Sequence, residues 1–210
     1  RAFHVKYFVP GSRDIGLVAH YNLNAGSIPL ELEAGIFNAS KINDPIWTEK
    51  LSWGASIVAG AMDGFRVSAK TYRYPGAERD LFVWGGDIRY GRDNYKVETE
   101  FLSRKNYIDN QTLNAAAIQG AISFPLSNPG IVKNIMPAVR WDIIGEAGNE
   151  YIMDASRITA GLSFGFATKP FASLLRIDYE KYIVNRLLPE LNLYDEMDSD
   201  KITVELLIIF

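Results

Sequence analysis

The chain has 210 residues, of which 48% are hydrophobic and 22% are charged, and it contains no cysteine. This composition can supply a core, so it excludes a disordered tail and a small disulfide-stapled domain. The net charge of -3 gives no reason to expect a nucleic-acid partner. The mean hydropathy of -0.05 argues against a helical membrane protein but fits a membrane barrel, in which half of each strand faces a polar lumen.

The dominant pattern along the chain is an alternation of apolar and polar residues with a period of two, which places the two sets on opposite faces of a strand. In the segment 156–166, for example, Ile158 and Leu162 alternate with Arg157 and Ser163. In chain order this pattern predicts twelve strands, at about 3–9, 14–23, 29–38, 50–60, 65–74, 81–90, 95–104, 112–125, 134–144, 156–166, 172–184 and 201–210.

The connections between these strands alternate in length. Every second connection averages about 5 residues and the others average about 9. Outer-membrane barrels have tight turns at the periplasmic end and longer loops at the extracellular end, whereas a Greek-key sandwich has no reason to sort its loops in this way. The fold class expected is therefore all-β: one antiparallel up-and-down transmembrane β-barrel domain, 1–210, with about twelve strands. The uncharged window 110–132 is long enough for a transmembrane helix, but polar residues and prolines interrupt it, so none is expected.

Aromatic residues gather near the predicted strand ends, as in the interfacial girdles of membrane barrels. They are Tyr7, Phe8, Tyr21, Phe37, Trp53, Phe65, Tyr74, Tyr90, Tyr95, Phe124, Trp141, Phe166 and Phe171. The last segment, 201–210, places apolar residues at alternate positions and ends on Phe210. Both features favour a membrane barrel over a soluble sheet.

The closing segment resembles the terminal strand of Gram-negative outer-membrane proteins, which the barrel-assembly machinery recognises. A narrower resemblance lies in Arg13-Asp-Ile-Gly-Leu17, Ala34-Gly-Ile-Phe-Asn38 and the segment 157–166, which are similar to strands of the phosphate-selective porin O and P family. That resemblance implies a trimeric porin of the outer membrane, in contact with its lipids and lipopolysaccharide. Members have sixteen strands, and only twelve residues precede Arg13 here, so the resemblance implies the C-terminal part of a longer barrel or a shortened relative.

The polar face predicts a lumen through which small polar or anionic, phosphate-like solutes diffuse, because guanidinium and ammonium groups replace hydration around an anion. The candidate pore-lining cations are Arg66, Lys70, Arg89, Lys96, Arg104, Arg140, Arg157 and Arg176. The same face carries Glu31, Glu33, Asp87, Glu98, Glu100, Asp142, Asp178, Glu180 and Glu205, so these charges alone predict no anion preference. The alternative is that the charges pair across strands and brace the wall, at about 0.2–1 kcal/mol per pair.

No enzyme, cofactor or metal is expected. The histidines are His4 and His20, His20 is predicted on the inward face, and neither a Gly-x-Ser-x-Gly elbow nor a zinc-binding cluster occurs. The acidic segment 185–200 could hold a divalent cation, but it lacks the glycine and terminal glutamate of a calcium loop, so a solvated outer loop is preferred. Two alternatives to a porin stay open: a plugged structural barrel, and a soluble β-sandwich that acts as an adhesin or binding module.

Overall fold

The structure, a computed structural model, describes residues 15–39, 49–61, 63–76, 79–127, 130–148, 150, 153–166, 173–187 and 199–208. All the regular elements of these residues are β-strands. They are β1 (Gly16–Ala25), β2 (Ile28–Phe37), β3 (Ser52–Gly60), β4 (Gly64–Pro75), β5 (Asp80–Arg92), β6 (Tyr95–Asn106), β7 (Thr112–Ile122), β8 (Phe124–Pro125), β9 (Asn134–Glu146), β10 (Ala155–Gly165), β11 (Leu174–Val184) and β12 (Lys201–Leu207). Within this part of the chain, no helix is long and apolar enough to cross a membrane.

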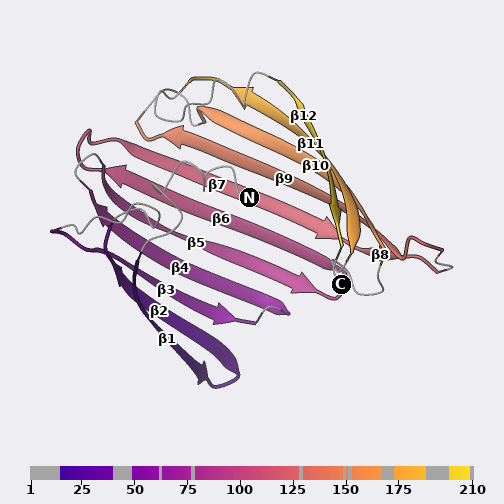
Figure 1. Cartoon of the computed structure of the whole chain (residues 1–210), viewed down its shortest axis with the longest axis horizontal. Helices are drawn as coiled ribbons and strands as arrows, with labels where there is room; N and C mark the ends of the chain where they lie inside the picture. Colours follow the sequence, from indigo (N-terminus) through magenta and orange to yellow (C-terminus); the bar gives the residue numbers. More distant parts are fainter. Residues whose placement is uncertain are drawn as a thin grey trace.

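The strands form one antiparallel sheet in which neighbours in sequence are neighbours in space, apart from β8, which pairs only with β9 (Figure 1). This confirms the all-β, up-and-down antiparallel architecture. The sheet is not closed in the described residues, since β1 and β12 are its two edges. The strand expected at 3–9, and its pairing with 201–210, lie outside the described residues.

The strands expected from 14–23 onward are all observed, and each end lies within three residues of the predicted one. The segment 112–125 differs, because the strand is interrupted at Ser123 and forms β7 and β8. Strands β7 and β8 pair with β9 in the same register, which places Pro137 of β9 opposite Ile122. Proline has no N–H to donate, so the ladder lapses there and resumes at Phe124.

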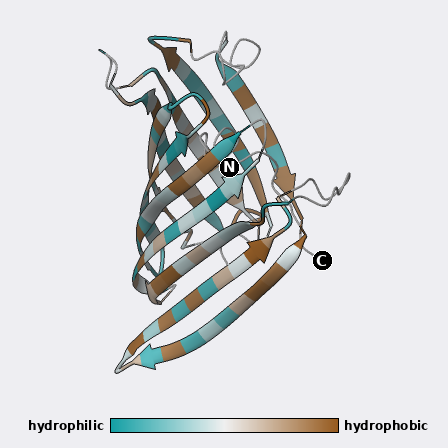
Figure 2. Ribbon diagram, turned by 90° about the vertical axis from the view of Figure 1, so that its left-hand side faces the viewer, coloured by the Kyte–Doolittle hydropathy of each residue, from teal (hydrophilic) through white to brown (hydrophobic). Residues whose placement is uncertain are grey.

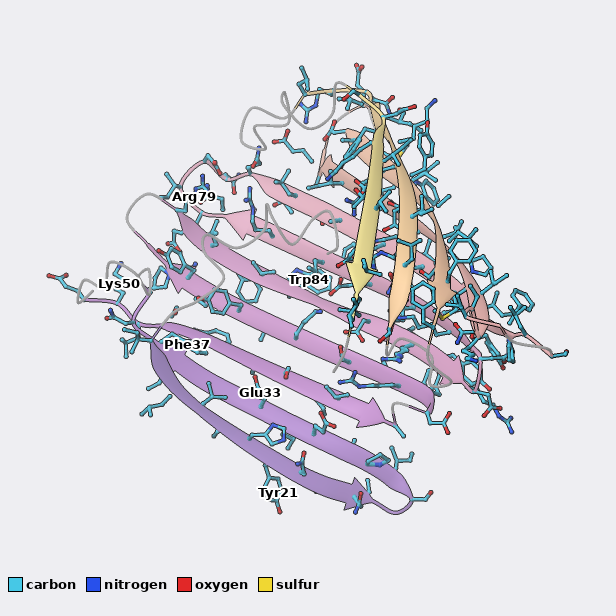
Figure 3. All side chains as sticks on the ribbon, turned by 45° about the vertical axis from the view of Figure 1, so that its right-hand side comes forward. Tyr21, Glu33, Phe37, Lys50, Arg79 and Trp84 are labelled. Carbon is cyan, nitrogen blue, oxygen red and sulfur yellow. The ribbon has the colours of Figure 1, made fainter. Side chains whose placement is uncertain are left out.

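The connections differ in length between the two ends of the sheet. At one end, the short-connection end, they have two, three, two, eight and eight residues, and at the other, the long-connection end, 14, four, five, eight and 16. The averages of about 5 and about 9 agree with the predicted ones. The alternation is absent over the three connections 126–133, 147–154 and 166–173, which have eight residues each. Positive φ angles at Gly26 (68°), Gly64 (110°) and Asp93 (45°) allow the three tightest turns. Lys50 and Arg79 lie in two connections of the long-connection end (Figure 3).

The sheet is strongly curved, with β10–β12 turned steeply against β3–β6 (Figure 1). Apolar and polar residues alternate along the strands as brown and teal bands (Figure 2). The charged face is the concave one, because side chains crowd together there: Arg157 is 12% exposed, whereas Val139 on the other face is 59% exposed. One apolar row crosses the convex face in continuous register: Phe65, Tyr90, Val97, Gly120, Val139, Ala160, Tyr179 and Ile202.

The concave face is not polar along its whole length. Near the long-connection end it carries a buried apolar cluster of Val83, Leu102, Leu113, Ala115, Ile144 and Ala155, against which Tyr72, Tyr182 and Val184 pack. Phe37, expected in the outer girdle, also belongs to this face, since it shares the parity of Glu33, and its ring lies 6.3 Å from that of Tyr72. Trp141 lies on the convex face but in the middle of β9, because that strand continues to Glu146.

The solvent-accessible surface of 13,399 Å² is large for a chain of 23.5 kDa. A compact monomer of this mass exposes about 9,800 Å². Convex-face side chains contribute to this large area, such as Leu17 at 76% and Ile202 at 71% exposure. Among the described residues, no protein layer covers the apolar face of the sheet.

Candidate functional site

The eight cations proposed from the sequence all lie on the concave face, on six different strands. They are Arg66 and Lys70 of β4, Arg89 of β5, Lys96 and Arg104 of β6, Arg140 of β9, Arg157 of β10 and Arg176 of β11. His20 also lies on this face, with Nδ1 at 3.7 Å from Oε2 of Glu33. The strand alternation therefore places these side chains together, although the positions are spread over more than 150 residues of sequence.

Asp142 is the centre of a hydrogen-bonded network on this face. Its side chain is fully buried, and both oxygens accept hydrogen bonds from Nε of Arg140, at 2.8 and 2.9 Å. Arg157, directly opposite Asp142 in the register, donates from Nη2 to Oδ2 at 3.0 Å. Two guanidinium groups thus compensate one buried carboxylate, which without partners would be costly to bury.

Gln119 extends the network from β9 towards β5. Its Oε1 accepts a hydrogen bond from Nη1 of Arg140 at 3.2 Å, and its Nε2 donates to Glu98. Glu98 also forms an ion pair with Arg89, in which Oε1 of Glu98 lies 3.2 Å from Nε of Arg89. An amide side chain suits this position, because it presents an acceptor to a cation and a donor to an anion.

Arg157 extends the network in the other direction, to β11. Its Nη1 lies 3.4 Å from Oε2 of Glu180, and the Tyr182 hydroxyl donates to the same oxygen at 3.0 Å. A continuous chain of polar contacts therefore crosses the concave face from β5 to β11.

Two smaller groups of charges flank this network. On β4, Lys70 pairs with Glu100 and, at 3.6 Å, with Asp87. On β11, Arg176 pairs with Asp178 at 2.9 Å and with Glu205 of β12 at 2.7 Å. The expected pairing across strands is confirmed for Lys70, Arg89, Arg157 and Arg176. The carboxylate that pairs with Arg140 lies on the same strand, β9.

Arg104 has a different environment from the other candidates. It stands between Val83 and Leu113 in the register, is 3% exposed, and donates from Nη2 to Oε1 of Gln111 at 3.2 Å. It lies beside the apolar cluster, so it braces the wall there and does not contact open solvent. The parity of the strand could place Arg104 on this face, but only the register shows that its neighbours are apolar.

Small residues follow the network towards the short-connection end. Gly91, Ala121, Ala138 and Gly161 occupy one row of the concave face with Lys96. A pocket of about 270 Å³ opens beside this row, with Arg89, Lys96, Asp63 and Met136 among its lining residues. The concave face is more accessible at this end than beside the apolar cluster, since Ala121 is partly exposed whereas Ala115 is buried.

At the long-connection end, a second polar group joins two connections. Asp154 is fully buried and accepts hydrogen bonds from Nε of Arg186 at 2.8 Å and from the backbone N–H of Glu146 at 2.6 Å. Arg186 also donates to Oε2 of Glu146, at 2.6 Å. These hydrogen bonds, to Asp154 first and then to Glu146, hold the pKa of the Arg186 guanidinium above its ordinary value.

Sequence reasoning did not identify Gln119, Tyr182 or Asp154. Gln119 and Tyr182 share the parity of the charged residues on their strands, which is the one sequence signal that could have found them. Of the acidic segment 185–200, the residues Glu190, Asp195, Glu196 and Asp198 lie outside the described part of the chain. The described residues hold no group of acidic or histidine side chains arranged for a metal ion.

Comparisons of this chain with protein-family models, with curated proteins and with solved structures gave no significant match.

Proposed function

We propose that this chain forms the wall of an outer-membrane β-barrel porin, through which small polar or anionic solutes diffuse passively. The observation that carries the proposal is the separation of side chains between the two faces of one curved meander. The convex face has an uninterrupted apolar row eight strands wide, and the concave face carries the charged network. Lipid on one side and water on the other would solvate such a sheet, as in membrane barrels.

The few charges of the convex face support this arrangement. Within the strands they are Arg73, Asp80, Arg92, Lys105 and Lys181, each within four residues of a strand end. A charge that faces lipid at the middle of the bilayer costs about 2–4 kcal/mol for Arg or Lys, and the cost falls to about 0–1 kcal/mol near the interfaces. The distribution is that of a wall whose middle contacts hydrocarbon.

The topology favours a barrel over the soluble sandwich. A sandwich packs two sheets face to face, commonly with Greek-key connections. The described strands instead form one sheet without a crossover. In a bilayer the backbone groups at the free edges of β1 and β12 need partners, so in the working porin further strands would complete the barrel. The resemblance noted above adds a homotrimer and recognition of the C-terminal strand by the assembly machinery to the proposal.

A plugged structural barrel is the second candidate, and the buried apolar cluster on the concave face favours it. The row Leu102, Ala115, Ile144, Ala155 and Val184 narrows the water-accessible part of this face near the long-connection end. A lumen filled at this level would keep the wall intact and stop the passage of solutes.

Conductance separates the two candidates. The purified protein is refolded in detergent, its folding is checked by heat-modifiable migration in electrophoresis, and it is inserted into planar bilayers. Stepwise conductance that increases with salt concentration supports the porin. A folded, heat-modifiable protein that inserts without conductance would leave the plugged barrel. A protein that stays soluble and folded without detergent would contradict both candidates.

A further inference from the structure

Two cations and an exposed aromatic ring meet on the convex face at the long-connection end. The guanidinium carbon of Arg73 lies 4.8 Å from the centroid of the Tyr107 ring, and Nζ of Lys105 lies 5.2 Å from it. Arg73 and Lys105 flank Phe82 in the register of β4, β5 and β6, so both project from the same face. We refer to Arg73, Lys105 and Tyr107 as the rim patch.

Hydrogen bonds of the backbone and of neighbouring side chains fix the position of the chain around the rim patch. The N–H of Tyr107 donates to the carbonyl of Asp80 at 2.8 Å, and the Asn106 side chain links the N–H of Asp80 to the carboxylate of Asp109. Arg73 also donates to the carbonyl of Leu81 at 2.9 Å. The ring is therefore held in place while it remains 50% exposed.

Of the two cations of the rim patch, Lys105 has no ion-pair partner among the described residues. Arg73 pairs with Asp80. Asp109 is engaged by the Asn106 amide and by the N–H of Gln111. Among the described residues, the contact of the Lys105 ammonium is the Tyr107 ring, and no carboxylate of these residues lies within ion-pair distance of it. An ammonium held over an aromatic face keeps N–H donors free for an anion.

The position of the rim patch along β6 matches one border of a bilayer. Tyr95 and Lys105 share the convex face of β6 and are ten residues apart, which at about 3.4 Å per residue gives about 34 Å along the strand. A strand tilt of about 40° reduces this to about 26 Å of height, close to the 25 Å apolar band of membrane barrels. The Tyr90 and Tyr95 rings, 5.8 Å apart, mark the other border.

We propose that the rim patch binds the phosphate of an anionic lipid headgroup at the long-connection border of the membrane. This inference rests on the proposed membrane location, which supplies the lipid. Lys105 would donate to the phosphate, and Tyr107 with the exposed Ile108 beside it would contact the glycerol and upper acyl region. Arg73, which pairs with Asp80, would hold the Tyr107 ring through its own contact with that ring. The occupant is a membrane lipid, because the patch borders the apolar face and not the concave face.

The test uses the purified protein in vesicles of phosphatidylcholine, with and without a minor fraction of phosphatidic acid. Insertion into phosphatidylcholine alone, measured by protection from protease, tests the proposed membrane location by itself, and its failure would overturn that location. Lipid retention is then measured by native mass spectrometry of the solubilised protein. The wild type is expected to retain phosphatidic acid in preference to phosphatidylcholine.

Variants assign the retention to the rim patch. Lys105→Gln and Tyr107→Leu are expected to weaken the apparent affinity for phosphatidic acid about tenfold, since the first removes the charged donor and the second removes the ring that holds it. Lys105→Arg keeps the charge and should preserve retention. Lys181→Gln removes a different convex-face lysine, which lies on β11, and serves as the matched control.

Three results would overturn the inference in a protein that inserts. The first is unchanged retention in Lys105→Gln. The second is an equal loss in Lys181→Gln. The third is full displacement of phosphatidic acid by inorganic phosphate, which would assign the patch to a free anion. Heat-modifiable migration of each variant shows that it has folded before its retention is compared.

Discussion

Asp142 and Arg157 face each other in register across β9 and β10, and Nη2 of Arg157 donates to Oδ2 of Asp142 at 3.0 Å. Asp142 is fully buried, and Arg157 is 12% exposed. The pair joins the two halves of the polar network, since Arg140 leads from Asp142 to β7 and Arg157 leads to β11. The concave wall between β5 and β11 is thus organised around one buried carboxylate.

Asp142→Asn is expected to destabilise the folded sheet by about 3–5 kcal/mol, because it leaves two largely buried guanidinium groups without their shared counter-charge. The measurement is denaturant unfolding of the refolded protein. Glu205→Gln is the matched control: Glu205 is 50% exposed, and its pair with Arg176 is worth about 0–1 kcal/mol. Equal losses in the two variants would show that burial at Asp142 carries no special weight.

Gln119→Glu is expected to change ion selectivity more than stability. The new carboxylate would stand opposite Arg140, which is favourable, and opposite Glu98, which is unfavourable, and each term is about 1 kcal/mol or less. Unfolding should therefore shift by less than about 1 kcal/mol. The added negative charge on the concave face should move the reversal potential in a salt gradient towards cation preference.

Ser27→Asp is the control for this prediction, since it adds the same charge in the turn between β1 and β2, away from the network. An equal shift of reversal potential in Ser27→Asp would show that the shift does not depend on placing the charge on the concave face. No shift in Gln119→Glu would place the network outside the path of the ions.

Asp154→Ala is expected to make local opening of the β9–β10 and β11–β12 connections more frequent where they join the strands. It should leave the network around Asp142 unchanged. It removes the acceptor of Arg186 and of the Glu146 N–H, and hydrogen bonds to a charged group are worth about 1.5–3 kcal/mol each. In the wild-type structure the amides of Asn185 and Arg186 donate to the backbone carbonyl of Asp154. These two amides should exchange faster with solvent in the variant. Unchanged protection there would show that backbone contacts alone hold the connection.

The sequence could predict the strands well because a period of two is a local signal. Parity alone placed Arg140, Arg157 and the other cations on one face. It could not separate Asp142, which is fully buried, from Asp178, which is 15% exposed, since both occupy the same kind of alternating position. That difference depends on register and curvature, which arise from pairing between distant strands.

The apolar cluster was missed for a similar reason. Leu102, Leu113 and Ile144 interrupt the polar face of three strands, and in each strand the interruption resembles an ordinary irregularity of the pattern. Register brings Leu102, Ala115 and Ile144 directly opposite one another. An apolar patch therefore becomes recognisable only when the strands are aligned.

Pro137→Ala is expected to join β7 and β8 into one continuous strand. The new N–H at position 137 would face the carbonyl of Ile122 and could add a hydrogen bond of about 0.5–1.5 kcal/mol. Loss of the proline frees the unfolded chain and opposes this gain by about 0.4–1 kcal/mol. Unfolding should therefore change by less than about 1 kcal/mol, while hydrogen exchange should show a protected amide at position 137. Pro125→Ala, on β8 itself, is the control. If the new amide at position 137 exchanges as fast as an amide in an open loop, something other than the missing N–H interrupts the ladder at Ser123.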